Sequence, residues 1–131
     1  MIKQQLKKKI AVKVEKTKTG FSAFAVDYPV FTTGKTMSEL SKNSVEALNF
    51  YFEDDGIEVD EKDVKLEIEL KQFFQFYKVL NAKFLADRIE MNPTLLSQYV
   101  QGRKKPSSVQ TEKILKGIRE IGKELSGLTL N

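Results

Sequence analysis

The stretch that decides the fold is NAKFLADRIEMNPTLLSQYVQGRKKPS, residues 81–107. Asn81 is a typical helix N-cap residue, and the apolar residues that follow it recur at spacings of three and four. Asn92 is a second cap residue, and Pro93 then takes the first helical position, where its missing N–H costs nothing. Gly102 is suited to end that second helix. We therefore expect two short helices joined by a turn of about three or four residues.

Two short helices joined in this way form the helix-turn-helix arrangement, in which the second helix lies in the major groove of DNA. The same stretch resembles the Xre/Cro/lambda-repressor family, and the resemblance covers roughly residues 72–126. Gln often follows the helix caps in that family, whereas Ala82 and Pro93 stand there in this sequence, so some of the family's contacts to phosphates and bases are not expected. The residues that carry the resemblance are Leu85-Ala86, Met91, Leu96, Ser97, Gly102 and Pro106-Ser107.

Helix geometry indicates which side chains of the second helix face outward. If Leu96, Tyr99 and Val100 pack inward, the other side chains can meet base edges. Gln98 is the first candidate because its amide can bond adenine N6 and N7 together, and Leu95 can contact a thymine methyl. Nearby basic residues would hold phosphates and set the register. The predicted DNA-binding residues are Lys83, Thr94, Leu95, Ser97, Gln98, Gln101, Arg103, Lys104 and Lys105.

Upstream of residue 72, apolar residues recur at every second position, which is the period of half-buried strands. The alternation is most regular over residues 64–70. Between the strands, Thr36-Met37-Ser38-Glu39 has the pattern of a helix capping box. The predicted elements are a strand from Ile10, strands over 21–27 and 30–33, a helix from Thr36 to about Phe52, and a strand over 64–70.

After residue 71 the apolar spacing changes to three and four and stays there. We therefore expect an α+β protein with a small β-β-β-α-β domain at residues 1–71 and an all-α helix-turn-helix domain at residues 72–131. The predicted helices of the second domain carry Phe73, Phe76 and Leu80, then Phe84, Leu85 and Ile89, then residues 93–101, and finally, behind a cap at Ser107, Ile114, Ile118, Ile121 and Leu125.

Charge is distributed unevenly along the chain, whose formal net charge is +4. Residues 21–71 contain five basic and twelve acidic residues, whereas residues 72–131 contain ten basic and five acidic ones. A basic C-terminal half suits an anionic partner such as double-stranded DNA, and an acidic middle segment suits a cationic one. The charge pattern therefore predicts two surfaces with different partners.

The residue types that are missing exclude several kinds of site. The sequence has no Cys and no His, so it lacks disulfides, thiolate ligands, the commonest general base and the commonest metal ligand. No apolar run approaches the roughly 18 residues that span a bilayer, and the basic start of the chain lacks the apolar segment of a signal peptide. We expect a cytoplasmic protein that does not enter membranes, is not an enzyme, and holds no metal and no cofactor.

The N-terminal domain resembles HicB-type antitoxins, which carry a small domain with a partial RNase H-like fold. The likeness lies in Tyr28-Pro29, Gly34-Lys35-Thr36 and Glu46-Ala47-Leu48, although Val30-Phe31 and Lys35 depart from that family's usual residues. By this resemblance the first domain would block a HicA-like toxin, a small basic ribonuclease, while the second domain represses the operon of the pair. The candidate toxin contacts are Asp27, Tyr28, Phe31, Glu53, Asp54 and Asp55.

Three alternatives stay open at this point. The chain could be a plain repressor whose first domain senses a ligand or only oligomerises, and the C-terminal helices could serve packing or dimerisation alone. An RNase H-like fold can also hold Mg²⁺ on carboxylates, for which the candidates are Glu15, Glu46, Glu67 and Glu69.

A single recognition helix covers too few base pairs for specificity, so we expect a homodimer or a higher homo-oligomer on two half-sites about 34 Å apart. The interface could be formed by Leu125, Leu128 and Leu130 or by an edge strand of the first domain. The sequence does not decide between these two surfaces.

Overall fold

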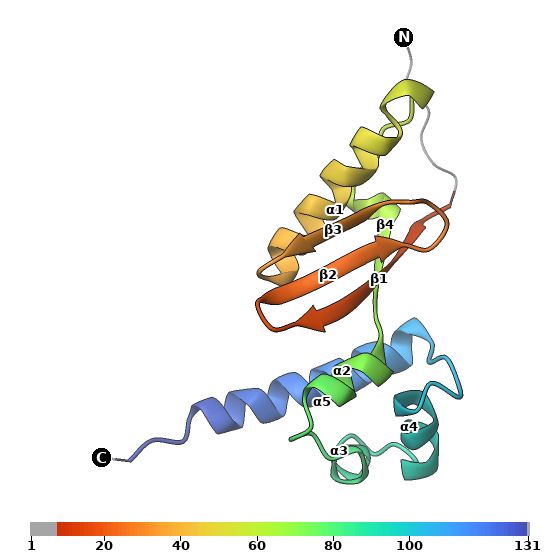
Figure 1. Cartoon of the computed structure of the whole chain (residues 1–131). Coiled ribbons are helices and arrows are strands. Elements are labelled where there is room, and N and C mark those ends of the chain that lie inside the picture. Colours follow the sequence, from red (N-terminus) through yellow and green to blue (C-terminus); the bar gives the residue numbers. More distant parts are fainter. Residues whose placement is uncertain (1–7, 131) are drawn as a thin grey trace. The chain divides into compact units, whose positions relative to one another are not determined.

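The structure is a computed structural model, and it describes residues 8–130. It divides into two compact units, of which unit 1 ends at Phe76 and unit 2 begins at Tyr77 (Figure 1). Within the described residues there are one four-stranded sheet and five α-helices, so the predicted α+β class is confirmed. The start of the chain, residues 1–7, where no signal peptide is predicted, lies outside the described residues.

Unit 1 is built on a four-stranded sheet with the strand order β3-β2-β1-β4. β1 (Ile10–Thr17) pairs antiparallel with β2 (Gly20–Ala25), and β2 pairs antiparallel with β3 (Phe31–Gly34). β4 (Val64–Ile68) pairs with β1 in the parallel sense. A parallel pair needs a crossover connection, and the chain between β3 and β4 supplies it with a helix.

That helix, α1 (Met37–Tyr51), covers one face of the sheet (Figure 1). It begins at Thr36, whose Oγ1 accepts a hydrogen bond from Glu39 N at 3.1 Å, as the sequence predicts for a helix cap. Its buried residues recur at every fourth position and pack against alternate residues of the strands. The core of unit 1 consists of Ile10, Val12, Val14, Ala23, Ala25, Leu40, Leu48, Phe52 and Val59.

The acidic segment between α1 and β4 is tied to α1 by Asn49. The Asn49 side chain accepts a hydrogen bond from Val59 N at 2.7 Å and donates one to Val59 O at 2.8 Å. Two short 3-10 helices, η1 (Glu53–Asp55) and η2 (Glu61–Asp63), lie on either side of this contact. Val59 itself is buried, so the segment follows the core closely although it is rich in carboxylates.

The last strand of unit 1 is shorter than the sequence predicts. β4 ends at Ile68, and α2 (Leu70–Phe76) begins where the alternating pattern had placed the end of the strand. Leu70 and Phe74 are both buried, so Leu70 fits the spacing of two in the strand and also the spacing of four in the helix. The prediction of a strand through Leu70 is therefore wrong.

Gln72 explains why unit 1 ends at Phe76 and not at Lys71, where the sequence had placed the boundary. Its side-chain amide accepts a hydrogen bond from Lys16 N at 2.8 Å and donates one to Lys16 O at 2.7 Å. Lys16 Nζ also lies 5.1 Å from the centroid of the Phe76 ring. α2 is thus joined to β1 and belongs to unit 1, and Leu80, predicted on the same helix, lies beyond its end.

Within its described residues, unit 2 contains α3 (Ala82–Arg88), α4 (Pro93–Val100) and α5 (Ser108–Ser126). Phe84 is 72% exposed, although its spacing had placed it among the apolar contacts of its helix. No helix in residues 8–130 combines the length and the apolar character that crossing a membrane requires. The buried residues of unit 2 are Leu85, Ala86, Met91, Leu96, Tyr99 and Ile114, together with Gly117.

Candidate nucleic-acid interface

The candidate interface starts at the caps of α3 and α4, where two asparagine side chains fix the first turns. Asn81 Oδ1 accepts a hydrogen bond from Phe84 N at 3.1 Å. Asn92 Oδ1 accepts hydrogen bonds from Thr94 N at 2.8 Å and from Leu95 N at 3.3 Å. Both predicted caps are confirmed. The first turns of both helices depend on these local contacts, because a capping side chain replaces a partner that the helix itself cannot provide.

The turn between α3 and α4 is defined by its backbone. Glu90 has a φ of 56°, in the left-handed region that residues other than glycine seldom adopt. Met91 N donates a hydrogen bond to Ala86 O at 2.9 Å, and the Met91 side chain is buried, as the sequence predicts. The turn therefore holds α4 at a set position relative to α3.

α5 packs closely on α3 at Gly117. A Cβ atom built on Gly117 would lie 2.4 Å from Ile89 Cγ2 and 3.3 Å from Leu85 Cδ1, so only glycine fits without a shift of its neighbours. Arg88 of α3 also forms a salt bridge with Glu124 of α5. Nothing in the sequence around Gly117 indicates this contact, because it arises where two helices separated in the sequence cross.

The two sides of α4 differ in burial. Leu96 and Tyr99 are 0% and 8% exposed, so one side of the helix is held in the core of unit 2 as predicted. Val100, which was also expected to pack inward, is half-buried. Thr94, at the start of the helix, is exposed. Among the predicted base-reading residues, the half-buried ones are Leu95, Ser97 and Gln98.

Gln101, just after α4, is exposed and bonded to a second predicted contact residue. Its Nε2 donates a hydrogen bond to Ser97 Oγ at 3.0 Å. This contact holds the two polar side chains together on one side of α4, because residues four apart on a helix are neighbours. It leaves the amide oxygen of Gln101 as an acceptor for another donor.

The basic loop, Arg103–Lys105, folds back on the end of α4. Gly102 has a φ of 76° and reverses the chain there, as expected of a residue that ends a helix. Arg103 N and Lys104 N then donate hydrogen bonds to Gln98 O at 2.9 Å and 3.3 Å. All three basic residues of the loop are exposed. Cationic side chains therefore start next to the residue that was predicted to read a base.

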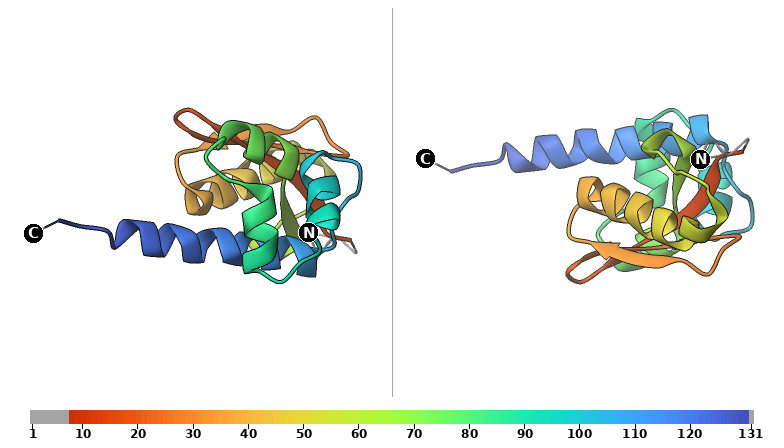
Figure 2. Two further views of the ribbon diagram at one scale, coloured as in Figure 1. Left: turned by 90° about the horizontal axis from the view of Figure 1, so that it is seen from below. Right: turned by 90° about the horizontal axis from the view of Figure 1, so that it is seen from above.

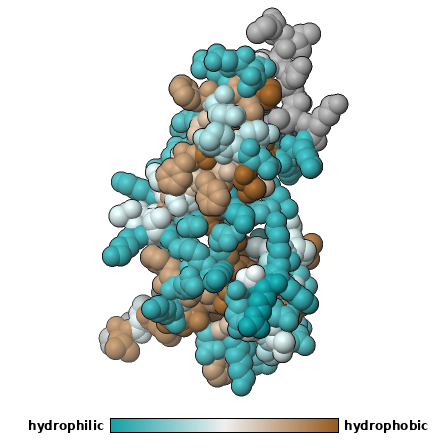
Figure 3. All heavy atoms as spheres, turned by 45° about the vertical axis from the view of Figure 1, so that its right-hand side comes forward, coloured by the Kyte–Doolittle hydropathy of each residue, from teal (hydrophilic) through white to brown (hydrophobic). Residues whose placement is uncertain are grey.

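The wider surroundings of α4 are also polar and basic. Lys83 is exposed in the first turn of α3, so the predicted phosphate contacts come from two separate elements. Residues 77–131 contain ten Lys and Arg residues against five Asp and Glu residues. Figure 3 shows many hydrophilic side chains on one face of the molecule.

Most of the predicted toxin contacts lie together in unit 1. The centroid of the Tyr28 ring is 4.9 Å from that of Phe52 and 5.8 Å from that of Tyr51, which brings Asp27 and Tyr28 to the C-terminal end of α1. η1 follows α1 directly, and its three acidic residues are exposed. We call this surface the acidic corner, and it consists of Asp27, Tyr28, Tyr51, Glu53, Asp54 and Asp55.

Phe31 lies apart from the acidic corner. Its neighbours Val30 and Thr32 line a cavity beneath α1, so the Phe31 side chain between them points to the opposite face of the sheet. There it is paired with Phe24 of β2, and the two side chains are 66% and 39% exposed. The six predicted toxin contacts therefore do not form one continuous surface.

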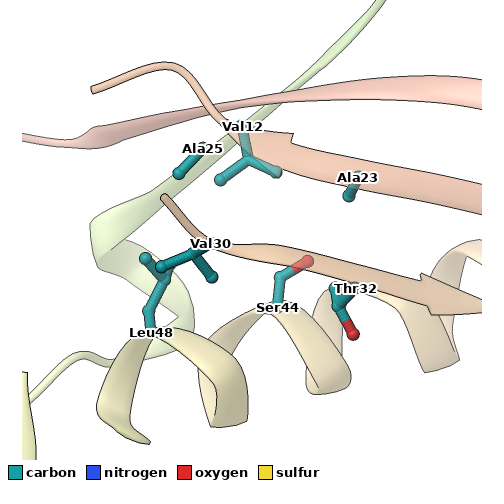
Figure 4. Close-up of a pocket in the computed structure, with 7 residues that line it drawn as sticks. All are labelled: Val12, Ala23, Ala25, Val30, Thr32, Ser44 and Leu48. Carbon is teal, nitrogen blue, oxygen red and sulfur yellow. The ribbon is translucent and has the colours of Figure 1, made fainter. Parts of the chain in front are cut away.

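The cavity between α1 and the sheet is small (Figure 4). Its volume is about 10 Å³, which is close to the space that one water molecule needs. Ser44 is 2% exposed, and its Oγ has no hydrogen-bond partner among the described residues. The cavity is too small for a metabolite or a cofactor. The residues that line it are Val12, Ala23, Ala25, Val30, Thr32, Ser44 and Leu48.

The carboxylates considered for a nuclease do not gather in one place. Glu69 forms a salt bridge with Lys13 at 3.0 Å, and Glu67 forms one with Lys65 at 3.6 Å. Glu46 is exposed on α1. In the part of the chain that the structure describes, no group of three or more Asp, Glu, His or Cys residues is placed to hold a metal ion.

Comparison of the chain with models of known protein families gives no match, and comparison with curated protein sequences gives none either. What the two surfaces can bind therefore has to follow from their own chemistry. α4 presents amides and hydroxyls beside a cationic loop, which suits the base edges and phosphates of duplex DNA. The acidic corner presents carboxylates beside aromatic rings, which suits a cationic protein surface.

Proposed function

We propose that the chain is an antitoxin that binds double-stranded DNA through unit 2 and a HicA-like toxin through unit 1. In this proposal unit 2 is a helix-turn-helix domain that represses the chain's own operon. Unit 1, whose β-β-β-α-β elements form a domain of the HicB kind and are followed by α2, blocks a small basic ribonuclease. The protein then works in the cytoplasm and acts by binding, without a cofactor and without catalysis of its own.

The observation that supports DNA binding most directly is the fold of the basic loop against α4. The backbone hydrogen bonds from Arg103 N and Lys104 N to Gln98 O fold the basic loop back on the end of α4, the helix that carries the Gln98 side chain. Contacts from cations to phosphates fix the register of a recognition helix, and contacts from an amide to base edges give the specificity. Both kinds of group are needed for sequence-specific binding, and the C-terminal end of α4 carries both.

The support for toxin binding is the acidic corner together with the likeness of unit 1 to HicB-type antitoxins. Glu53, Asp54 and Asp55 are exposed on η1, which follows the C-terminal end of α1, where the rings of Tyr28 and Tyr51 lie 5.8 Å apart. A ribonuclease that binds RNA has a cationic surface, and an acidic surface both attracts and masks it. The cavity beneath α1 has room for about one water molecule, so it gives no support to the alternative in which unit 1 senses a metabolite.

A mobility-shift titration with the full chain tests the DNA-binding half. The duplexes are the segment upstream of the chain's own gene and a scrambled duplex of the same length and base composition. We expect the upstream duplex to bind at least about 10³-fold more tightly, because specific complexes usually exceed non-specific ones by that margin. Equal affinity for the two duplexes would remove the assignment of α4 as a recognition helix.

Co-expression with the product of the neighbouring gene tests the antitoxin half. We expect the full chain to co-purify with a small basic protein and to suppress its cleavage of RNA. If the chain binds the upstream duplex but captures no neighbouring product and suppresses no cleavage, it is a plain repressor whose first unit senses a ligand or only oligomerises.

A further inference from the structure

Ser44 is the one buried polar side chain among the residues that the structure describes. It lies on α1 between Leu40 and Leu48, four residues from each, and all three are buried. Its Oγ has no hydrogen-bond partner within residues 8–130. A buried hydroxyl that stays unpaired destabilises a fold, and alanine would also be the better helix former. Packing of α1 on the sheet therefore does not explain why a hydroxyl stands at this position.

The Ser44 side chain lines the cavity between α1 and the sheet. The volume of this cavity is about 10 Å³, which is close to the room that one water molecule needs. Figure 4 shows the hydroxyl of Ser44 directed from α1 toward the sheet and that of Thr32 directed from β3 toward α1. The other side chains that line the cavity are apolar. The cavity therefore offers a water molecule hydroxyl groups from two different elements.

The strand on one side of the cavity, β3, has few other supports. It lies at the edge of the sheet, so it is paired on one side only, with β2. It runs beside α1, as the view from above in Figure 2 shows. Asn43 of α1 donates a hydrogen bond from Nδ2 to Thr33 O at 2.8 Å. The next residue of α1, Ser44, and the preceding residue of β3, Thr32, are the two that carry the hydroxyls of the cavity.

We propose that the cavity binds one water molecule, and that this molecule joins Ser44 Oγ to Thr32 Oγ1 by hydrogen bonds. Each hydroxyl can donate and accept, so both can bond to the same water molecule. The buried serine is then paired, as buried polar groups usually are. Together with the hydrogen bond of Asn43, the water molecule holds the edge strand β3 against α1. The site belongs to unit 1 and does not depend on what either unit binds.

Nuclear magnetic resonance of the full chain tests the site through cross-relaxation between water and methyl protons. We expect a cross-peak from a long-lived water molecule to the methyl group of Ala23, which lines the cavity. The methyl group of Ala86 in unit 2 is the matched control, because it is also 0% exposed and does not line the cavity. Ser44→Ala and Thr32→Val each remove one hydroxyl. Either change should abolish the Ala23 cross-peak, since apolar cavities stay dry.

Amide hydrogen exchange and thermal unfolding measure what the water molecule does for β3. Ser44→Ala should speed exchange of the β3 amides about tenfold and leave the amides of β4, the other edge strand, unchanged. The double variant of Ser44→Ala and Thr32→Val should unfold at a higher temperature than the sum of the two single shifts implies. Both changes break the same bridge, so the second has less left to remove.

Two results would overturn the inference. One is the absence of the Ala23 cross-peak from the wild-type chain, which would mean that the Ser44 hydroxyl turns to Leu40 O, four residues earlier on α1. The other is a cross-peak that survives in Thr32→Val, because Ser44 alone would then account for it. A Ser44→Ala chain that is more stable than the wild type, with strictly additive shifts in the double variant, would equally show that no water molecule bridges the two hydroxyls.

Discussion

The acidic corner of unit 1 and the basic loop of unit 2 carry opposite charges, although each unit is closed around its own apolar core. Exposed carboxylates gather at the acidic corner of unit 1, and exposed cations gather on the basic loop of unit 2. Each unit also has a central leucine that is 0% exposed, Leu48 in the first and Leu96 in the second. Because their charges differ in sign, the two surfaces suit different partners. The separate cores imply that either surface can be disabled alone.

Leu96→Ala should have the largest effect, and its effect should be confined to unit 2. Loss of a fully buried leucine costs about 2–5 kcal/mol because the cavity left behind is only partly filled. α4 is then no longer held in the core of unit 2, so specific DNA binding should disappear. Capture of the toxin should persist. Thermal denaturation followed by circular dichroism, together with the mobility shift, measures both outcomes.

Leu48→Ala is the matched control, because it removes the same side chain from the core of unit 1. Unit 1 should lose a similar amount of stability, about 2–5 kcal/mol, so toxin capture should be abolished. DNA binding through unit 2 should persist. If either variant loses both activities, the two units are not separable in the way that their cores indicate.

Gln98→Ala and Lys104→Ala should separate the two kinds of DNA contact within unit 2. Removing the amide should weaken the binding free energy by about 1–3 kcal/mol for the upstream duplex and by little for the scrambled one. Removing the lysine should weaken binding to both duplexes and lower the dependence of affinity on salt by about one counterion. Lys62→Ala, an exposed lysine of unit 1, serves as the control. Equal losses on both duplexes for Gln98→Ala would show that Gln98 does not read a base.

Gly117→Ala should destabilise unit 2 by about 1–2 kcal/mol, since overpacking at Ile89 exceeds the gain in helix propensity. Urea denaturation measures the loss. Ile89→Ala removes the atom that the new methyl group would meet. The double variant should therefore be more stable than the sum of the two single losses implies. Strictly additive losses would show that the two side chains do not meet as the structure places them.

The elements that the sequence predicts correctly are those set by local chemistry. Thr36, Asn81, Asn92 and Ser107 each cap a helix through a backbone N–H two or three residues further along, so their neighbours in the sequence are enough to identify them. The alternating strands of unit 1 follow for the same reason, because one buried face imposes a period of two.

The features that the sequence does not predict depend on contacts between distant residues. Leu70 satisfies both a strand and a helix pattern, and the hydrogen bonds between Gln72 and Lys16 accompany the helix. Phe31 was predicted as a toxin contact together with Asp27 and Tyr28, but the pleat of β3 turns it to the other face of the sheet. Charge composition indicated that the acidic segment has a cationic partner. It did not indicate which side chains share a surface.

The smallest expected effect concerns the acidic corner. It tests whether the toxin docks on this surface or is attracted by the carboxylates of unit 1 wherever they lie. Asp54→Asn should slow association with the toxin severalfold at low salt and much less at high salt, because exposed charges act mainly on the rate of encounter and are screened by ions. The dissociation rate should change little. Rapid-mixing kinetics at two salt concentrations measures both rates.

Glu46→Gln removes the same charge from an exposed position on α1 outside the acidic corner, and it is therefore the matched control. If the corner docks against the toxin, Asp54→Asn slows association and Glu46→Gln does so much less, since steering falls off with distance from the contact. Equal slowing by the two variants would mean that the carboxylates of unit 1 guide the encounter wherever they lie on its surface. The toxin would then have to dock on another surface, and the exposed pair of Phe24 and Phe31 on the opposite face of the sheet would be the next one to vary.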